Sequence, residues 1–501
     1  MLEQVRHLKT DTVTLSAPRP LKIVFAAVLG IFTSSNPLQI LFAKTLEARG
    51  HKCKFVLCDQ QLPLCEVTCD SHRISRSHQC AQCYAYGKKL FKNAGVDIVL
   101  VSELVDSTTN SASNQTDWSE FINATALRYY EVGSLTETPD LQKNRMLWQE
   151  SAEISAKMGQ GIVDTKPDRI FSSHGSYTTR GPARTIINDA GIPLVSYDRG
   201  KIKSTLKFNW KHPSDWWDVS DEWEKVKNTP LTETEESKID NYLASRRTHS
   251  DDMLVYNFGK EQTATNTRER FGFDPEKITY ALFTNVLWDA ASAQREIAFE
   301  NPIEWVFETI TWFLKHPEKQ LIVKIHPAEV VIGTRQPFKD IIAERFPDMP
   351  ANIKVIPPDE EVNSWSIIAV TDIGLVHTTT VGMELPLEGI PCVVVSNTHY
   401  RGKGFTIDVE TPEDYVDILE TFNPHDVKKR ELRILSKRYA YLLFFRYQLP
   451  MPYVYPPTHY LVKSLAIENI QEMLDHPSMQ VFINAFENEQ DFLLPTACQT
   501  S

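Results

Sequence analysis

The sequence contains little glycine and no glycine-rich phosphate loop. It has 19 glycines in 501 residues, and neither a Walker-type loop nor a Gly-x-Gly-x-x-Gly run occurs in it. Both loops use glycine to bring backbone N–H groups close to phosphates, so their absence argues against ATPase and dehydrogenase chemistry. If the protein binds a nucleotide, other residue types must hold the phosphate.

Long apolar runs are also missing. The most apolar stretch, Ile23–Phe32, is far shorter than the roughly 20 residues that span a bilayer as a helix. Nothing before it combines a basic segment, an apolar core and a small-residue cleavage site, which together mark a secretory signal. We therefore expect a cytoplasmic protein that associates with a membrane only peripherally, at the inner face of the cytoplasmic membrane.

Positive charge is not in excess, and cysteine is sparse. The formal net charge is -12 and the pI is about 5.7, whereas proteins that bind nucleic acid backbones present a basic face. We expect no nucleic acid partner. The chain has 8 cysteines, and in a reducing compartment a cluster of them indicates metal or redox chemistry rather than a disulfide framework.

The order of apolar segments predicts an α/β protein with two doubly wound, Rossmann-like domains. The length exceeds what one hydrophobic core usually organises. A buried strand at Leu21–Leu29, a helix at Leu38–Arg49 and a strand at His51–Cys58 form an opening βαβ unit. The rhythm recurs in strands at Val96–Val101, Arg169–Ser172 and Ile192–Tyr197.

A second αβ series predicts the other domain. Its expected strands are Ile278–Phe283, Leu321–Ile325, Ile353–Ile356, Ile373–Val376 and Cys392–Val395. We place the first domain at residues 21–250, the second at 251–430, and a helical segment at 431–475 that packs back on the first. Two such domains face each other across a cleft, and ligands bind outside the carboxyl ends of their strands.

The run Lys324-Ile325-His326-Pro327-Ala328-Glu329 is the sharpest local signal. The strand before it delivers His326 to the edge of the sheet, and Pro327 ends the strand because it lacks an N–H. An imidazole there can bond a nucleotide phosphate and stabilise charge on a leaving phosphate. The alternative is a loop histidine beside a turn proline. We include Lys324, His326 and Glu329 in the predicted nucleotide site.

A threonine-rich turn follows the strand Ile373–Val376. Thr378, Thr379 and Thr380 stand where a helix begins, and helix N-termini favour anions. Simple capping by one threonine is the alternative. Glu384, one turn further on, either accepts hydrogen bonds from ribose hydroxyls or is a solvated helix charge.

Two further segments are expected to contact the donor. Arg401 and Lys403 alternate with Gly402 and Gly404 in a loop that could close over a carboxylate or phosphate; an exposed loop is the alternative. Asn285 and Asp289 follow the first strand of the second domain. All four complete the predicted donor site.

The first domain offers two candidates for a general base. His174 and Asp198 each follow a strand that should end on the same side of the sheet. Transfer to a hydroxyl group needs a base to take its proton. Either residue could also be merely structural.

Cys65, Cys69, Cys80 and Cys83 form a cluster with spacings of four, eleven and three, within a cysteine-rich loop at residues 58–83. The Cys80–Cys83 spacing lets two thiolates share one tetrahedral zinc ion. A structural zinc site is the favoured interpretation; an iron–sulfur cluster and unligated reduced thiols are the alternatives. Cys58, His72 and His78 leave the exact ligands open.

The segments 324–329, 378–384 and 400–405 resemble the bacterial capsule polysaccharide and surface-carbohydrate family that includes Kdo transferases. The resemblance implies an inverting, metal-independent GT-B glycosyltransferase with no catalytic cofactor. It implies a nucleotide-sugar donor, CMP-linked Kdo or a sialic-acid-like sugar, held by His326 and Thr378–Thr380, and a glycan or glycolipid acceptor. The base in that family is an acidic residue of the first domain, and Asp198 is the candidate here.

Three other functions stay open on the sequence alone. A sugar-nucleotide epimerase or a polyol-phosphate transferase would use the same fold and a similar donor pocket. A non-catalytic subunit of a polysaccharide assembly complex would bind without turnover. Thermal stabilisation by a panel of nucleotides would narrow these functions most.

Overall fold

The computed structural model describes Val5, Leu8 and residues 19–32, 35–69, 75–108, 116–255, 259, 261–289, 294–455 and 462–496, with the backbone alone for Thr68, Cys69 and Tyr455. The chain divides into two compact units. Unit 1 contains residues 1–129, 136–216 and 445–501, and unit 2 contains residues 130–135 and 217–444. The sequence-based borders lie at 250 and 430.

Unit 1 is built on a seven-stranded sheet in the order β13-β6-β5-β4-β1-β2-β3. Strands β1 to β5 are parallel and β6 is antiparallel to β5. The strands are β1 (Lys22–Val28), β2 (Lys52–Leu57), β3 (Asp97–Leu100), β4 (Arg169–Ser173), β5 (Leu194–Arg199), β6 (Thr205–Trp210) and β13 (Leu449–Pro450). Its helices are α1 (Asn36–Ala48), α2 (Glu66–Cys69), α3 (Arg76–Ala94), α4 (Val101–Asp106), α5 (Ser119–Tyr130), α6 (Pro139–Asp164), α7 (Gly181–Asp189), α18 (Ile470–Asp475) and α19 (Pro477–Asn488). A small hairpin pairs β14 (Val454–Tyr455) with β15 (Ser464–Leu465).

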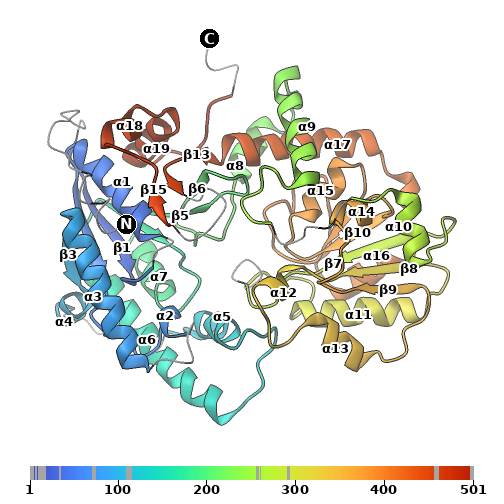
Figure 1. Cartoon of the computed structure of the whole chain (residues 1–501), viewed down its shortest axis with the longest axis horizontal. Helices are drawn as coiled ribbons and strands as arrows, with labels where there is room; N and C mark the ends of the chain where they lie inside the picture. Colours follow the sequence, from blue (N-terminus) through green and yellow to red (C-terminus); the bar gives the residue numbers. More distant parts are fainter. Residues whose placement is uncertain are drawn as a thin grey trace. The chain divides into compact units, whose positions relative to one another are not determined.

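Alternate residues of β1 enter separate cores, so the sheet of unit 1 is covered on both faces. Ile23 and Phe25 belong to the core that includes Phe42 of α1 and Phe482 of α19. Val24 belongs to the other core, with residues of α4, α6 and α7. Figure 1 shows α18 and α19, in red, beside the blue helix α1. The end of the chain therefore packs on its first βα unit.

Unit 2 has a six-stranded sheet in the order β12-β11-β10-β7-β8-β9, and every pair in it is parallel. The strands are β7 (Thr279–Phe283), β8 (Gln320–Lys324), β9 (Ile353–Ile356), β10 (Ile373–Val376), β11 (Cys392–Val394) and β12 (Ile407–Asp408). The helices are α8 (Ser220–Val226), α9 (Glu233–Thr248), α10 (Ala264–Phe271), α11 (Pro302–Leu314), α12 (Ala328–Val331), α13 (Phe338–Arg345), α14 (Ser364–Ile368), α15 (Val381–Leu387), α16 (Pro412–Thr421) and α17 (Lys429–Tyr441). One core contains Tyr280 of β7, Trp305 of α11 and Tyr415 of α16.

Close packing also ties α15 to β10 in unit 2. A Cβ atom on Gly374 would lie 2.1 Å from Cδ1 of Leu385, so only glycine lets the helix approach the strand this closely. The threonine turn between them is thereby held at the end of the strand.

The predicted α/β class is confirmed: each of the two units is a doubly wound, Rossmann-like domain. Both sheets reverse their strand order beside their first strand, between β1 and β4 in unit 1 and between β7 and β10 in unit 2. Such reversals are the places where open α/β sheets bind ligands. Among the described helices, none is both long enough and apolar enough to cross a bilayer.

Candidate functional site

The strand-order reversal of unit 2 brings three predicted site segments together. The loops after β7, β8 and β10 start from neighbouring strands and leave the sheet at one edge. The backbone N–H of Thr378 donates to Oδ1 of Asn285 at 3.2 Å, which joins the loops on the two sides of the reversal. The backbone N–H of His326 donates to Oγ1 of Thr284 at 3.0 Å, which joins the third loop. Side chains of the β7 loop therefore hold the other two in place.

The ring of His326 has a defined orientation. Its Nδ1 accepts a hydrogen bond from the backbone N–H of Ala328 at 3.1 Å. In a neutral imidazole the proton must then be on Nε2, which makes Nε2–H a donor. A donor at the carboxyl end of a strand suits a phosphate oxygen.

The turn at Thr378–Thr380 offers hydroxyl groups that the fold does not use for capping. Thr380 stands at the N-cap of α15 and makes no side-chain capping bond. Oγ1 of Thr378 is buried and has no hydrogen-bond partner within the part of the chain that the structure describes. Since α15 has seven residues, we attribute anion affinity here to the hydroxyl groups rather than to a helix dipole.

Tyr400 fixes this turn from the loop after β11. Its side chain is fully buried, and its hydroxyl donates to the backbone carbonyl of Thr379 at 2.7 Å. A Cβ atom on Gly382 would lie 2.4 Å from that hydroxyl. Glycine at 382 is thus required for Tyr400 to reach the turn.

Two ionisable side chains beside His326 have shifted pKa values because they are buried. Burial lowers the pKa of Lys324 to about 8, although Glu360 and Asp359 oppose the shift. Burial raises the pKa of Glu329 to about 7. Oε2 of Glu329 accepts from the backbone N–H of Phe338 at 3.2 Å, while Oε1 is buried with no partner among the described residues. The carboxyl group is therefore protonated in much of the population at neutral pH.

Glu384 is buried and belongs to an ion-pair network. Arg246 of α9 donates to its Oε1 from Nη2 at 2.5 Å and from Nε at 3.0 Å, and to Asp252 from Nη1 at 2.6 Å. His249 contacts the other oxygen of Asp252 at 2.8 Å. Glu384 is therefore not a solvated helix charge, and its position is fixed by Arg246.

The cations of the 399–405 loop are engaged within unit 2. The guanidinium of Arg401 donates to the carbonyls of Val394 and Val409 at 3.0 and 2.8 Å and pairs with Glu410. Nζ of Lys403 donates to Oγ of Ser220 at 2.7 Å, and burial lowers its pKa. Arg401 therefore ties its loop to β11 and to the residue after β12. Asp289 is exposed at the end of the β7 loop.

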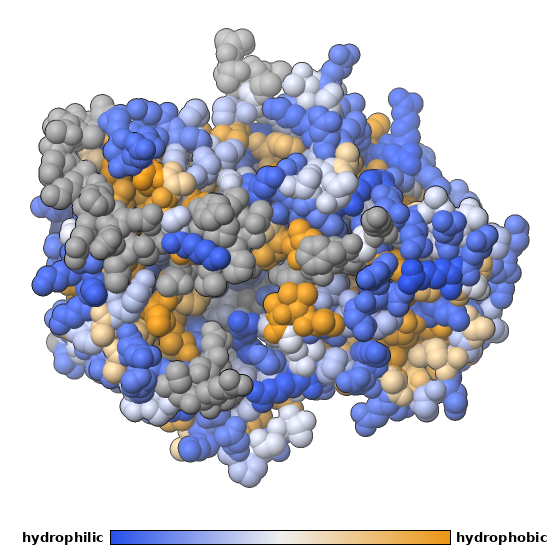
Figure 2. Space-filling model, in the orientation of Figure 1, coloured by the Kyte–Doolittle hydropathy of each residue, from blue (hydrophilic) through white to orange (hydrophobic). Residues whose placement is uncertain are grey.

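Apolar side chains are exposed directly after the His326 loop. Val330, Val331 and Ile332 are 60, 58 and 42% exposed, and Figure 2 shows apolar surface where α12 lies in Figure 1.

In unit 1, the two candidate bases lie after β4 and in β5. His174 has a positive φ of 61°, and burial, reinforced by Arg180, lowers its pKa to about 4. Burial raises the pKa of Asp198 to about 6, although Lys207 opposes the shift. His174 is thus neutral at physiological pH and Asp198 is largely ionised, so both are in the form that accepts a proton.

Arg180 spans the strand-order reversal of unit 1. It is 3% exposed, and its Nη2 donates to the carbonyl of Ala27 in β1 at 2.7 Å. Its Nε is buried without a partner among the described residues, and the ring of Phe32 lies 5.6 Å from its guanidinium carbon. Ring centroids of Phe32 and His174 are 5.4 Å apart. These residues lie at the strand-order reversal between β1 and β4.

The cysteine cluster is described in part. Cys80 and Cys83 lie one turn apart on α3, and Cys65 directly precedes α2; the side chain of Cys69 is outside the described residues. Arg180 interacts electrostatically with both Cys65 and Cys83. No group of three metal-ligating side chains converges among the residues that are described. The metal site remains a prediction.

Sequence reasoning placed Thr284 in a segment expected to contact the donor, but it did not identify Arg246 or Arg180 as site residues. Arg246 lies on a strongly charged helix that looks like a solvated surface, so only the fold reveals its partner. A signal for Arg180 existed: Thr178-Thr179-Arg180-Gly181 follows β4 as Thr378-Thr379-Thr380-Val381-Gly382 follows β10. Both strands hold the fourth position in their domain, so the two turns are topologically equivalent.

Comparison with known proteins assigns neither a family nor an activity to this chain. No family model and no curated protein sequence matches this chain. Among solved structures, the beta Kdo 2,4 transferase KpsC of Thermosulfurimonas dismutans is 17% identical, covering 56% of this chain and 81% of that chain with a TM-score of 0.36. Its beta Kdo 2,7 transferase KpsC is 12% identical over 67% and 90%, with a TM-score of 0.34. MurG of Acinetobacter baumannii is 12% identical over 83% and 95%, with a TM-score of 0.28. No residue's role is transferred at these values.

Proposed function

We propose that the protein is a glycosyltransferase that binds a nucleotide-sugar donor in unit 2 and a glycan or glycolipid acceptor in unit 1. The observation that carries this proposal is the junction of Asn285, Thr378, Thr284 and His326 at the strand-order reversal of unit 2. It presents an imidazole N–H and threonine hydroxyls at the position where such sheets bind ligands. No glycine-rich loop is needed.

The chemistry follows from what these groups can donate. When the bond between the sugar and the phosphate breaks, negative charge grows on the phosphate oxygen. A preorganised N–H or O–H directed at that oxygen stabilises the transition state more than the bound donor. His326 and Thr378 are the donors we assign to this role. Tyr400 and Glu384 are positioning residues, since they act through the turn and its helix.

The acceptor hydroxyl must lose its proton to a base. We assign this role to Asp198. Its pKa of about 6 leaves the carboxylate ionised at pH 7, and a pKa near the working pH favours proton transfer from the acceptor. His174 is the second candidate. A base acting directly on the acceptor corresponds to an inverting mechanism, and no metal takes part in the proposed steps.

The donor we propose is CMP-linked, with Kdo or a sialic-acid-like sugar, and the pathway is bacterial surface polysaccharide synthesis. The support is the similarity of the 324–329, 378–384 and 400–405 segments to that family. The expected cytoplasmic location and peripheral membrane association stay predictions.

Nucleotide release from a donor panel tests the proposed function. The full chain is incubated with CMP-, UDP-, GDP- and CDP-activated donors, with and without lipid-linked or free glycan acceptors. We expect acceptor-dependent release of CMP and a glycosylated product. Epimerised donor without acceptor-dependent release would indicate an epimerase, a phosphodiester product from the CDP donor would indicate a polyol-phosphate transferase, and binding without turnover would indicate an assembly subunit.

A further inference from the structure

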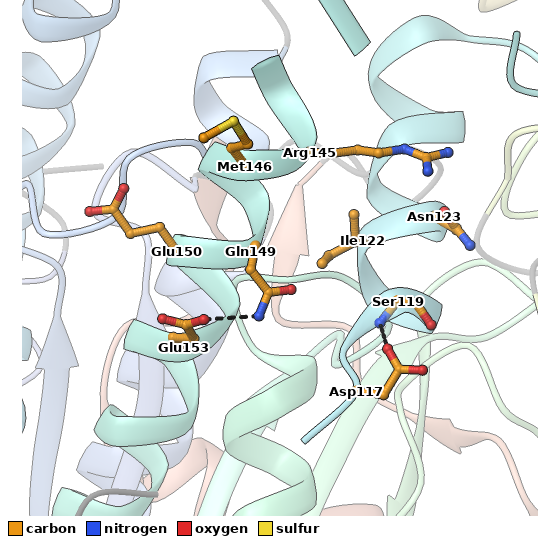
Figure 3. Close-up of a pocket in the computed structure, with 9 residues that line it drawn as sticks. All are labelled: Asp117, Ser119, Ile122, Asn123, Arg145, Met146, Gln149, Glu150 and Glu153. Atoms are coloured by element: carbon orange, nitrogen blue, oxygen red, sulfur yellow. Dashed lines mark hydrogen bonds between the residues drawn. The ribbon is translucent and has the colours of Figure 1, made fainter. Parts of the chain in front are cut away.

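A pocket of about 550 Å³ lies between α5 and α6 of unit 1 (Figure 3). Its volume is within the roughly 300–1,000 Å³ of typical small-molecule sites. Ser119 and Asn123 line it from α5, and Arg145 and Gln149 line it from α6. None of these residues belongs to the predicted transfer site.

The polar lining favours a ligand that both donates and accepts hydrogen bonds. Asp117, Glu150 and Glu153 supply carboxylate acceptors, and Arg145 is the one cation in the lining. This excess of negative charge disfavours phosphates and carboxylates as ligands. Amide groups come from Asn123 and Gln149. A sugar hydroxyl donates to a carboxylate and accepts from an amide or guanidinium, so it fits both kinds of group.

Gln149 and Arg145 are the two polar side chains of the lining on which the ligand argument depends. Figure 3 shows Nε2 of Gln149 bonded to Oε1 of Glu153, at 2.9 Å, which orients the amide. Nη2 of Arg145 pairs with Glu137 at 3.1 Å. Its Nε is buried and has no hydrogen-bond partner among the described residues. A buried donor without a partner costs stability unless a ligand or water satisfies it.

Apolar contacts in the same pocket suit the C–H face of a sugar ring. Met146 of α6 is 75% exposed, an unusual exposure for a large apolar side chain, and Ile122 of α5 also lines the pocket. A flexible thioether adapts to ligands of varied shape. The pocket therefore combines an apolar surface with oriented polar groups, as ligand sites do.

Both walls of the pocket are bonded to the turn that carries Arg180. From α5, Oγ1 of Thr125 accepts from the backbone N–H of Thr178 at 3.1 Å. From α6, Oγ of Ser155 donates to the carbonyl of Thr179 at 3.0 Å. A ligand in the pocket is thus one helix away from the edge where the acceptor would react.

We propose that this pocket binds a neutral saccharide unit and acts as an outlying subsite for a glycan acceptor. The binding rests on the pocket alone. Its role as an acceptor subsite rests on the proposed function.

Calorimetric titration of the full chain, without nucleotide, tests the binding. The probes are maltohexaose, cellohexaose and chitohexaose, with hexagalacturonate as the anionic probe and the chitosan hexamer as the cationic probe. We expect a neutral hexasaccharide to bind and hexagalacturonate not to bind. Gln149→Ala removes an oriented amide and should weaken binding about tenfold.

Gln142→Ala is the matched control, because Gln142 is exposed on the same helix and does not line the pocket; it should bind like the parent protein. Met146→Glu, at an exposed position, tests the apolar contact without risk to the core and should also weaken binding. The proposal is overturned if no neutral probe binds, if Gln149→Ala and Met146→Glu bind as the parent does, or if only the chitosan hexamer binds and salt abolishes that binding. Since no donor is present, failure of glycosyl transfer would not change these results.

Discussion

At the scale of single residues, the protonation and orientation of side chains determine what each can do. His326 has its Nδ1 occupied by a backbone N–H, so it acts as a donor through Nε2. His377 is buried, and burial lowers its pKa to about 3. It is therefore neutral at physiological pH. Because His377 is also only 3% exposed, the imidazole that we assign to the phosphate is His326, which is half-buried.

His326→Ala should lower kcat more than it raises KM. Loss of one preorganised donor to a developing anion typically costs about 100- to 1,000-fold in turnover, while Thr378–Thr380 still bind the ground state. Steady-state kinetics with the donor found in the panel measures both constants. His425→Ala, an exposed histidine of unit 2, should leave both unchanged. A large rise in KM with unchanged kcat would reduce His326 to an affinity contact.

The raised pKa of Asp198 predicts the pH at which activity falls on the acid side of the profile. Its raised pKa means that the base is protonated, and inactive, below about pH 6. We expect kcat/KM to fall tenfold per pH unit well below that value. Asp198→Asn should remove most activity at every pH. A profile flat down to pH 5, the range in which His174 with its pKa of about 4 is still neutral, would point to His174 instead.

Glu329 links stability to pH. Its folded-state pKa is raised from 4.5 to about 7, so the stability it contributes is complete below pH 4.5 and is lost as the pH rises through 7. At about 1.4 kcal/mol per pKa unit, the loss is at most about 3.5 kcal/mol. Glu329→Gln should remove it, so the variant gains on the parent protein between pH 5 and 8 in chemical denaturation. The exposed Glu344→Gln on α13 is the control; a constant difference for Glu329→Gln across that range would contradict the assignment.

At the scale of elements, the predicted strands agree best where apolar residues make up most of the strand. The segments Ile353–Ile356 and Ile373–Val376 were predicted with the bounds that β9 and β10 have. β6, in contrast, was not predicted: its sequence TLKFNW mixes polar and apolar residues. Its Lys207 is fully buried because the ammonium donates to the carbonyl of Trp216 at 2.6 Å. Trp216 lies nine residues away in a loop, and no local sequence pattern predicts this hydrogen bond.

The candidate site also combines features that the local sequence predicts with contacts that only the fold reveals. Strand ends and threonine-rich turns are visible in a sequence, so His326 and Thr378 could be placed at one edge of a sheet. Arg246 and Glu384 are 138 residues apart in the sequence, and their ion pair depends on how α9 packs. Contacts of this kind are decided by tertiary structure, so the network around Glu384 could not be predicted.

The predicted zinc site depends on Cys80 and Cys83 of helix α3. A Cβ atom on Gly30 would lie 2.2 Å from the carbonyl oxygen of Cys83, so backbone contact holds the loop after β1 on this helix. Zinc analysis of purified protein should give close to one ion per chain, and Cys80→Ser with Cys83→Ser should abolish it. Cys392→Ser, at a buried cysteine of β11, should retain it. Absence of both zinc and iron from protein prepared anaerobically without chelators would refute the metal site.

At the scale of the whole molecule, each unit repeats one topology and each has its own strand-order reversal. In unit 2 the reversal is joined by Asn285 and Thr378, and in unit 1 by Arg180 and Ala27. The division of labour we propose, donor in unit 2 and acceptor in unit 1, follows from the different groups at these two places. Hydroxyls and an imidazole N–H suit a phosphate, whereas Asp198 suits an acceptor hydroxyl.

The most direct measurement is calorimetric titration of the full chain with CMP, CDP, UDP and ATP, repeated on Asn285→Ala and Thr378→Val. The account predicts that a pyrimidine nucleotide binds, that both variants weaken it, and that Thr371→Val, a buried threonine of unit 2 outside the site, does not. At 100 times the dissociation constant that nucleotide should also stabilise the parent protein by about 2.7 kcal/mol. Binding of no nucleotide, or equal binding by Asn285→Ala, Thr378→Val and the parent protein, would contradict it.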